Sequence, residues 1–158
     1  MKGCFASYVG ANGIVNLSRT FELPSIAGKE SLSVEEIIQF IEVGKGVGYA
    51  EAVRVYGILA ERIVSWIEEM YKMRGDKRFI LTGGVTAGQA GRILSEKINN
   101  KLRERSDIKG VSVTLSEVNR EYGGAIGAAF FAMSLASRSF DGPVHVTIES
   151  VNEVACCL

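Results

Sequence analysis

The sequence predicts an α/β fold with a small mixed sheet and flanking helices, and three patterns carry that prediction. A short apolar run at Arg78–Leu81 ends near two adjacent glycines and is followed by a helical pattern. A second run, Val111–Leu115, alternates apolar and polar residues as a half-buried strand does. Upstream, Val34–Val43 and Tyr49–Met73 repeat apolar residues at helical spacing.

Length and composition fit one soluble domain. The 158 residues can bury a core, and 47% of them are apolar. The 18 basic residues equal the 18 acidic ones, so we expect no direct contact with nucleic acid. The sequence holds no long uncharged apolar run and no signal peptide, which indicates a cytoplasmic protein without membrane contact.

Cysteine and histidine, which commonly ligate metals, are few in this sequence. Cys4, Cys156 and Cys157 show no ligand spacing, and their odd number argues against a disulfide framework. His145 is the only histidine and falls on the polar side of a candidate strand, Val144–Glu149. We therefore predict no metal site in this chain.

The N-terminal part allows two interpretations. Asn12-Gly13 between apolar runs indicates a β-hairpin within Phe5–Leu17, whereas the alternative is a loop that enters a short helix near Ile14–Thr20. The stretch Leu23–Ser31, with a proline, a glycine and small polar residues, indicates a linker.

The two predicted helices after this linker have clearer signals. Ser33, with Glu36 three residues later, forms the pattern of a capping box, and the helix it starts stops at Gly44. The longer helix is apolar around most of its circumference and needs cover on most sides. Its single tryptophan, Trp66, is expected to pack in the core and not to stack on a base.

The pair Gly83-Gly84 lies between the first strand and the helix predicted at Gly88–Arg105. Adjacent glycines allow a sharp turn, and they also allow a ligand to lie against the backbone without a Cβ in the way. The N-terminus of the following helix favours negative charge at the same place. The pattern alone fits either a plain tight turn or a ligand site.

Several segments occur in the order found in a known family. LTGGVTAGQAGRILSEKI at residues 81–98, then a strand, then YGGAIGAAFFA at residues 122–132, resembles the closing half of the actin-like (ribonuclease H-like) sugar kinase fold. The nearest pattern is the ROK family of sugar kinases and sugar-responsive repressors, and Gly3-Cys4-Phe5-Ala6 resembles its Gly-Cys-x-Glu segment. The resemblance covers about residues 3–135. It implies a C-terminal lobe at 1–140, followed by a strand and tail at 141–158.

This resemblance implies a nucleotide site without catalytic residues. The family's sugar-contacting glutamate is Ala6 here, and its phosphate loops and catalytic aspartate precede the matching region. The resemblance implies that this chain keeps the residues that line the adenosine side of the nucleotide site, where ATP or ADP would bind weakly. These residues are Gly83, Gly84, Val85, Thr86, Gly124 and Gly127.

Two functions follow as expectations. One is a ROK-like lobe without the catalytic half, a regulatory or partner-dependent subunit that is inactive alone and becomes an ATP-dependent sugar kinase when complemented. The partner would be a second copy in a homodimer or a chain carrying the N-terminal lobe. The alternative is an ATPase subunit resembling the activators of 2-hydroxyacyl-CoA dehydratases and benzoyl-CoA reductase, which share the TGGV turn and the GAIGAA helix.

Overall fold

The computed structural model describes residues 8–116, and within them the fold is α/β with much more helix than strand. The elements in chain order are α2 (Ala11–Thr20), α3 (Leu23–Ile26), α4 (Val34–Val43), α5 (Tyr49–Arg74), β1 (Arg78–Leu81), the 3-10 turn η1 (Gly84–Thr86), α6 (Gly88–Glu104) and β2 (Ser112–Leu115). The helices and strands predicted between residues 34 and 115 are confirmed. The helix predicted at Gly123–Met133, the strand predicted at Val144–Glu149 and the boundary at residue 140 lie outside the described residues.

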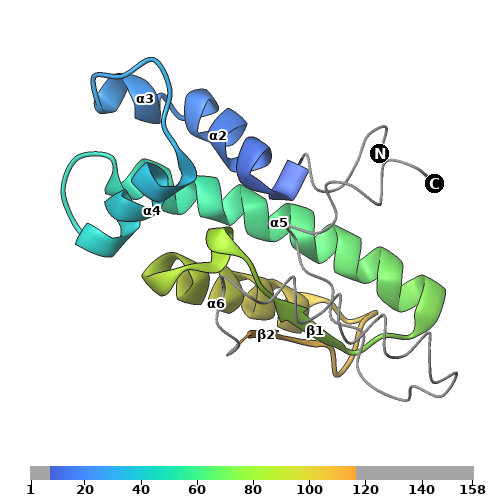
Figure 1. Ribbon diagram of the computed structural model, residues 1–158. Helices are drawn as coiled ribbons and strands as arrows, with labels where there is room; N and C mark the ends of the chain where they lie inside the picture. The colour runs from blue at the N-terminus through green and yellow to red at the C-terminus, as the bar shows by residue number, and fades with distance from the viewer. Residues whose placement is uncertain (1–7, 117–158) are drawn as a thin grey trace, which may run out of the picture.

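Helix α5 is the element on which the others pack. Figure 1 shows it running through the middle of the molecule, with α2 and α3 above it and α6 with both strands beneath it. The buried residues of α5 form a continuous apolar stripe along the helix. This agrees with the prediction that other elements must pack against most of its sides. The buried residues of this stripe are Ala52, Val55, Tyr56, Leu59, Ala60, Ile63, Val64 and Ile67.

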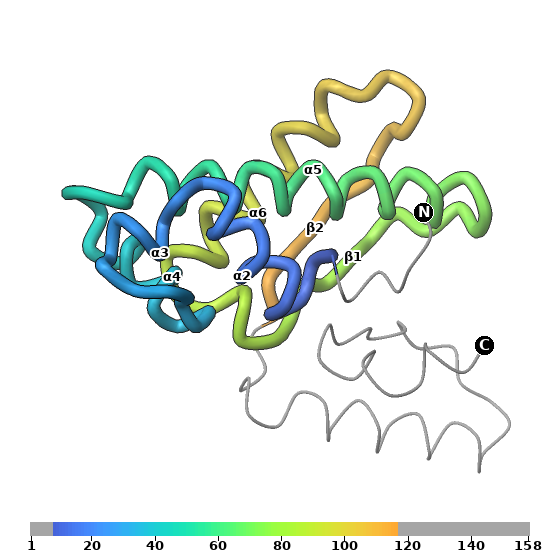
Figure 2. Tube along the Cα trace, turned by 90° about the horizontal axis from the view of Figure 1, so that it is seen from above, coloured from blue at the N-terminus to red at the C-terminus, as the bar shows by residue number. Residues whose placement is uncertain are grey.

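The two described strands form a parallel pair in which Arg78 lies opposite Ser112 and Leu81 opposite Leu115. A parallel pair needs a crossover, and α6 supplies it. Seen from above, the strands run side by side beneath α5 (Figure 2). Trp66 of α5 packs edge-on against Phe79 of β1, with ring centroids 6.0 Å apart, so its predicted role in packing is confirmed. The prediction of a mixed sheet depends on the third candidate strand, Val144–Glu149, which lies outside the described residues.

The predicted hairpin in Phe5–Leu17 is wrong, because Ala11–Thr20 is helix α2. The alternative, a loop entering a short helix, agrees with the structure. Ile14 and Leu17 lie three residues apart and are both buried, which is a helical spacing. Burial of this face against α5 outweighs the local turn preference of Asn12-Gly13.

The predicted linker Leu23–Ser31 contains a short helix, α3. Pro24 stands in its first turn, where the missing N–H costs nothing, and both Leu23 and Pro24 are buried. The linker prediction therefore missed one helical turn whose apolar residues join the core.

The capping box at the start of α4 is confirmed. The Glu36 backbone N–H donates to Ser33 Oγ at 3.3 Å, and the Ser33 N–H donates to Glu36 Oε2 at 2.8 Å. Two N–H groups at the start of the helix are thereby satisfied. Gly44 is the C-cap, so both ends of α4 are defined, and Glu42 is the next-to-last residue of the helix.

No helix within residues 8–116 is long and apolar enough to cross a membrane.

Candidate functional site

The turn after β1 has a defined geometry that begins with a glycine. Gly83 has φ of 103°, a conformation that residues with a Cβ rarely adopt. The chain then winds through η1, where the Thr86 N–H donates to Gly83 O at 3.0 Å and the Ala87 N–H donates to Gly84 O at 3.1 Å. The Thr86 hydroxyl donates to Gly83 O as well, at 2.8 Å. Three hydrogen bonds thus hold a turn of five residues.

Tyr56 of α5 supports this turn from inside. Its side chain is fully buried, and its hydroxyl donates to the Val85 carbonyl at 3.1 Å. Burial raises the pKa of the Tyr56 hydroxyl well above its ordinary range, and the negative charge of Glu42 raises it further. The hydroxyl therefore keeps its proton and remains a hydrogen-bond donor to the turn.

Helix α6 approaches the turn closely at its first residues. A Cβ at Gly91 would fall onto the backbone carbonyl oxygen of Thr86, so the absence of a side chain lets α6 and η1 touch. The Gly91 N–H also donates to Ala87 O at 3.0 Å. The predicted unit of strand, glycine turn and helix is therefore one packed body.

A carboxylate from another helix occupies the N-terminal end of α6. Glu42 of α4 accepts a hydrogen bond from the Gln89 backbone N–H at 2.6 Å. A Cβ at Gly88 would overlap the same carboxylate. A negative charge is stabilised here because unpaired N–H groups and the helix dipole point at it.

The structure assigns different roles to the residues predicted for the site. Gly84 is exposed and can touch a ligand, whereas Gly83, Val85 and Thr86 are buried. The last two shape the turn, because Val85 accepts the bond from Tyr56 and Thr86 bonds to Gly83. Gly124 and Gly127 lie outside the described residues.

Sequence reasoning missed Tyr56 and Glu42. Gln89 and Glu42 are 47 residues apart, and Tyr56 and Val85 are 29 apart, so no local spacing connects them. A signal for Tyr56 was available, since a tyrosine inside an apolar helical stripe needs a buried partner for its hydroxyl. Nothing in the sequence pattern singles out Glu42.

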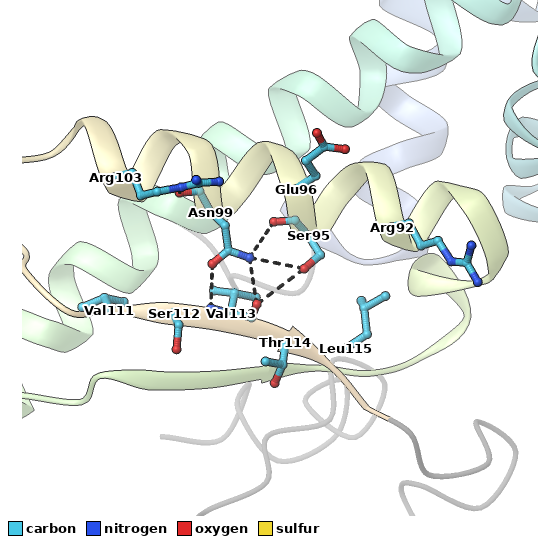
Figure 3. Close-up of a pocket in the computed structure, with 10 residues that line it drawn as sticks. All are labelled: Arg92, Ser95, Glu96, Asn99, Arg103, Val111, Ser112, Val113, Thr114 and Leu115. Atoms are coloured by element: carbon cyan, nitrogen blue, oxygen red, sulfur yellow. Dashed lines mark hydrogen bonds between the residues drawn. The ribbon is translucent and has the colours of Figure 1, made fainter.

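A second region with polar side chains is the groove between α6 and the outer edge of β2 (Figure 3). Asn99 points from α6 onto the strand, and its amide Nδ2 donates to Val113 O at 2.8 Å while its Oδ1 accepts from the Val113 N–H at 3.0 Å. Arg92 and Arg103 stand toward opposite ends of the groove, and Glu96 points away from β2. Asn99 thus takes the hydrogen bonds that a neighbouring strand would make, and it closes this edge at its centre.

Within residues 8–116, no three side chains of histidine, cysteine, aspartate or glutamate come together as a metal site. The arrangement that the described residues offer is a rigid backbone turn with one exposed glycine and a carboxylate beside it. Such a surface offers exposed backbone and one negative charge to a ligand.

The chain matches no family model, no curated protein and no solved structure.

Proposed function

We propose that this chain is a nucleotide-binding lobe of the actin-like ATPase kind, most similar to the ROK sugar kinases, which holds adenosine, ADP or ATP at the Gly83-Gly84 turn. The observation that carries the proposal is the turn itself. It follows a strand, begins with a glycine at φ 103° and leaves Gly84 exposed beside the N-terminus of α6. Ligands in α/β folds bind at such carboxyl ends of strands.

The binding is weak in this proposal, with a Kd no better than roughly millimolar, because contacts to the phosphates are few. The chain alone transfers no phosphoryl group, since that step requires a positioned base, a metal ion and a phosphate cradle. We therefore assign the chain a regulatory or partner-dependent role in the cytoplasm.

The partner we propose is a second copy of the chain or a chain carrying the complementary lobe. Within residues 8–116, β1 pairs with β2 and has no strand along its other edge. Val43, Val47 and Met73 are large apolar side chains that are exposed. Unpaired strand edges and exposed apolar residues both favour association. Light scattering should give twice the mass of one chain, and a single-chain mass at all concentrations would rule out the homodimer.

Amide chemical shifts of the purified chain test the binding proposal. Adenosine and ADP should shift the amides of Gly83–Gly88, and Gly84→Val should abolish these shifts because its side chain fills the exposed position. The matched control is Gly57→Ala on α5, where a Cβ meets nothing within 4 Å. Shifts that stay unchanged up to about ten times the expected Kd would leave the turn with a purely structural role.

Phosphorylation assays test the proposal that the chain alone transfers no phosphoryl group. The purified chain, given ATP, magnesium and a hexose, should form no sugar phosphate. ATP-dependent phosphorylation that disappears in Gly84→Val would contradict the assignment of the chain as non-catalytic.

A further inference from the structure

The N-terminal end of α6 is the place in the described structure best suited to an anion, and the protein supplies the anion itself. The first N–H groups of a helix have no partner within it, and the helix dipole adds partial positive charge there. Glu42 Oε1 lies 2.6 Å from the Gln89 backbone nitrogen. A carboxylate from α4 therefore stands where the phosphate of a ligand would otherwise bind.

The packing of α4 places this carboxylate, which belongs to an exposed side chain, at the start of α6. Helix α4 packs against both η1 and α6, and its Ile37 and Ile41 are buried on the core side. A Cβ at Gly88 would lie 2.0 Å from Glu42 Oε1, so the glycine lets the Glu42 side chain reach the α6 backbone. No lysine or arginine among the described residues forms an ion pair with Glu42. Its charge is also felt at the turn, since it contributes to the raised pKa of Tyr56.

We propose that Glu42 determines which part of a ligand the turn accepts: its carboxylate keeps phosphate away from the N-terminus of α6, so that the uncharged nucleoside portion lies against Gly84. This inference rests on the proposed function in taking the turn as the nucleoside site. The pattern of strand, glycine turn and helix by itself predicts that negative charge is favoured at this place. The inference instead predicts that the turn prefers the uncharged nucleoside portion of a ligand. Like charges a few ångströms apart repel, and Glu42 already accepts the hydrogen bond of one of the N–H groups, that of Gln89, to which a phosphate would bind.

The variant that tests the inference is Glu42→Gln. Glutamine has nearly the same shape and keeps an oxygen that can accept the hydrogen bond from Gln89, so only the charge is removed. Glu69→Gln is the matched control, because Glu69 is an exposed glutamate on α5 and the substitution changes the net charge equally. The probes are adenosine, ADP and inorganic phosphate, each titrated into the full chain while amide shifts are recorded.

The wild-type chain and Glu69→Gln should bind adenosine and ADP with similar affinity, and phosphate should leave the Gln89 amide unshifted. In Glu42→Gln, ADP affinity should rise about five- to ten-fold relative to adenosine, and phosphate should shift the Gln89 amide. An unchanged ratio of adenosine to ADP affinity in Glu42→Gln would overturn the inference while adenosine binding itself still supports the nucleoside site.

The two proposals fail in different ways. If neither adenosine nor ADP shifts the turn in any variant, the proposed function is wrong, and the phosphate titration decides the role of Glu42 without reference to nucleosides. A Gln89 shift by phosphate in Glu42→Gln, absent in the wild type and in Glu69→Gln, supports anion exclusion. Equal responses of the three proteins to phosphate contradict it.

Discussion

At Gly91 a single hydrogen atom in place of a side chain lets α6 touch the glycine turn. A Cβ there would lie 2.0 Å from the Thr86 carbonyl oxygen, which belongs to the backbone and cannot rotate away as a flexible side chain would. Gly91→Ala should therefore destabilise the protein by about 2–3 kcal/mol, as overpacking of a tight contact does. Urea unfolding followed by circular dichroism measures this change.

Gly57→Ala is the control for the same exchange on a helix. No atom lies within 4 Å of the added Cβ, and alanine is the better helix former. We expect a gain of about 0.5–1 kcal/mol. A gain of similar size at both positions would show that helix propensity, and not the contact with Thr86, governs Gly91.

The Tyr56 hydroxyl gives a second prediction on the scale of one residue. Tyr56→Phe keeps the ring in the core and removes the donor to the Val85 carbonyl. That carbonyl then lacks a partner, so the free energy of unfolding should fall by about 1–2 kcal/mol. The control is Tyr71→Phe on the same helix, because the Tyr71 hydroxyl makes no hydrogen bond within residues 8–116, and it should change little. Equal losses of unfolding free energy in Tyr56→Phe and Tyr71→Phe would show that the hydrogen bond to the turn does not cause the loss.

Among the secondary-structure elements, α6 and β2 are joined by side-chain hydrogen bonds to Val113, two from Asn99 and a longer one from Ser95 Oγ. Asn99 bonds both the N–H and the C=O of Val113 and so replaces a neighbouring strand. Asn99→Leu should lower the stability by about 1–3 kcal/mol, because the Val113 N–H loses its partner and the Val113 carbonyl keeps only the longer bond from Ser95 Oγ. Hydrogen exchange at the Val113 amide should accelerate. Asn100→Leu is the control, since Asn100 is exposed and bonds only to Arg103 among the described residues. An unchanged Val113 amide in Asn99→Leu would contradict this account.

The start of α4 predicts a dependence of stability on pH. The hydrogen bond from Lys29 and then that from the Ser33 backbone hold the pKa of Glu36 below its ordinary value of 4.5. A lowered pKa in the folded state contributes stability that is present above the unfolded value and is lost as pH falls through the folded value. Unfolding free energies should therefore decline below about pH 4.5.

Glu36→Gln should flatten this decline, and Lys29→Met should make it smaller, because the strongest cause of the lowered Glu36 pKa is removed. Some slope should survive in Glu36→Gln, because backbone and Ser33 hydrogen bonds also lower the pKa of Glu35. A pH profile identical in Glu36→Gln and in the wild type would show that the capping box does not titrate with folding.

The same elements show what the sequence can and cannot predict. The capping box of Ser33 and Glu36 was predictable because both residues belong to one helical turn. The hairpin at Asn12-Gly13 was predicted wrongly, since a local turn preference says nothing about the α5 surface that α2 covers. The Glu42 carboxylate at α6 was beyond sequence reasoning, because helix signals fix where α4 ends but not which helix it meets.

For the whole molecule, the described elements converge on the glycine turn. Helix α5 supports it through Tyr56, α4 places Glu42 beside it, and α6 packs onto it at Gly91. Buried side chains from α2 to β2 form one continuous core around α5. A turn held by contacts from three helices has less conformational freedom to lose when a ligand binds than an unsupported loop would.

The central claim is that the Gly83-Gly84 turn holds the nucleoside part of a nucleotide. A crystal structure of the chain soaked with ADP tests it most directly, because it shows which residues the bound molecule touches. The account predicts the adenosine portion against Gly84, with the phosphates directed away from Glu42 and the N-terminus of α6. Density for ADP in the groove between α6 and β2, or phosphates bound at Gln89 in place of Glu42, would contradict it.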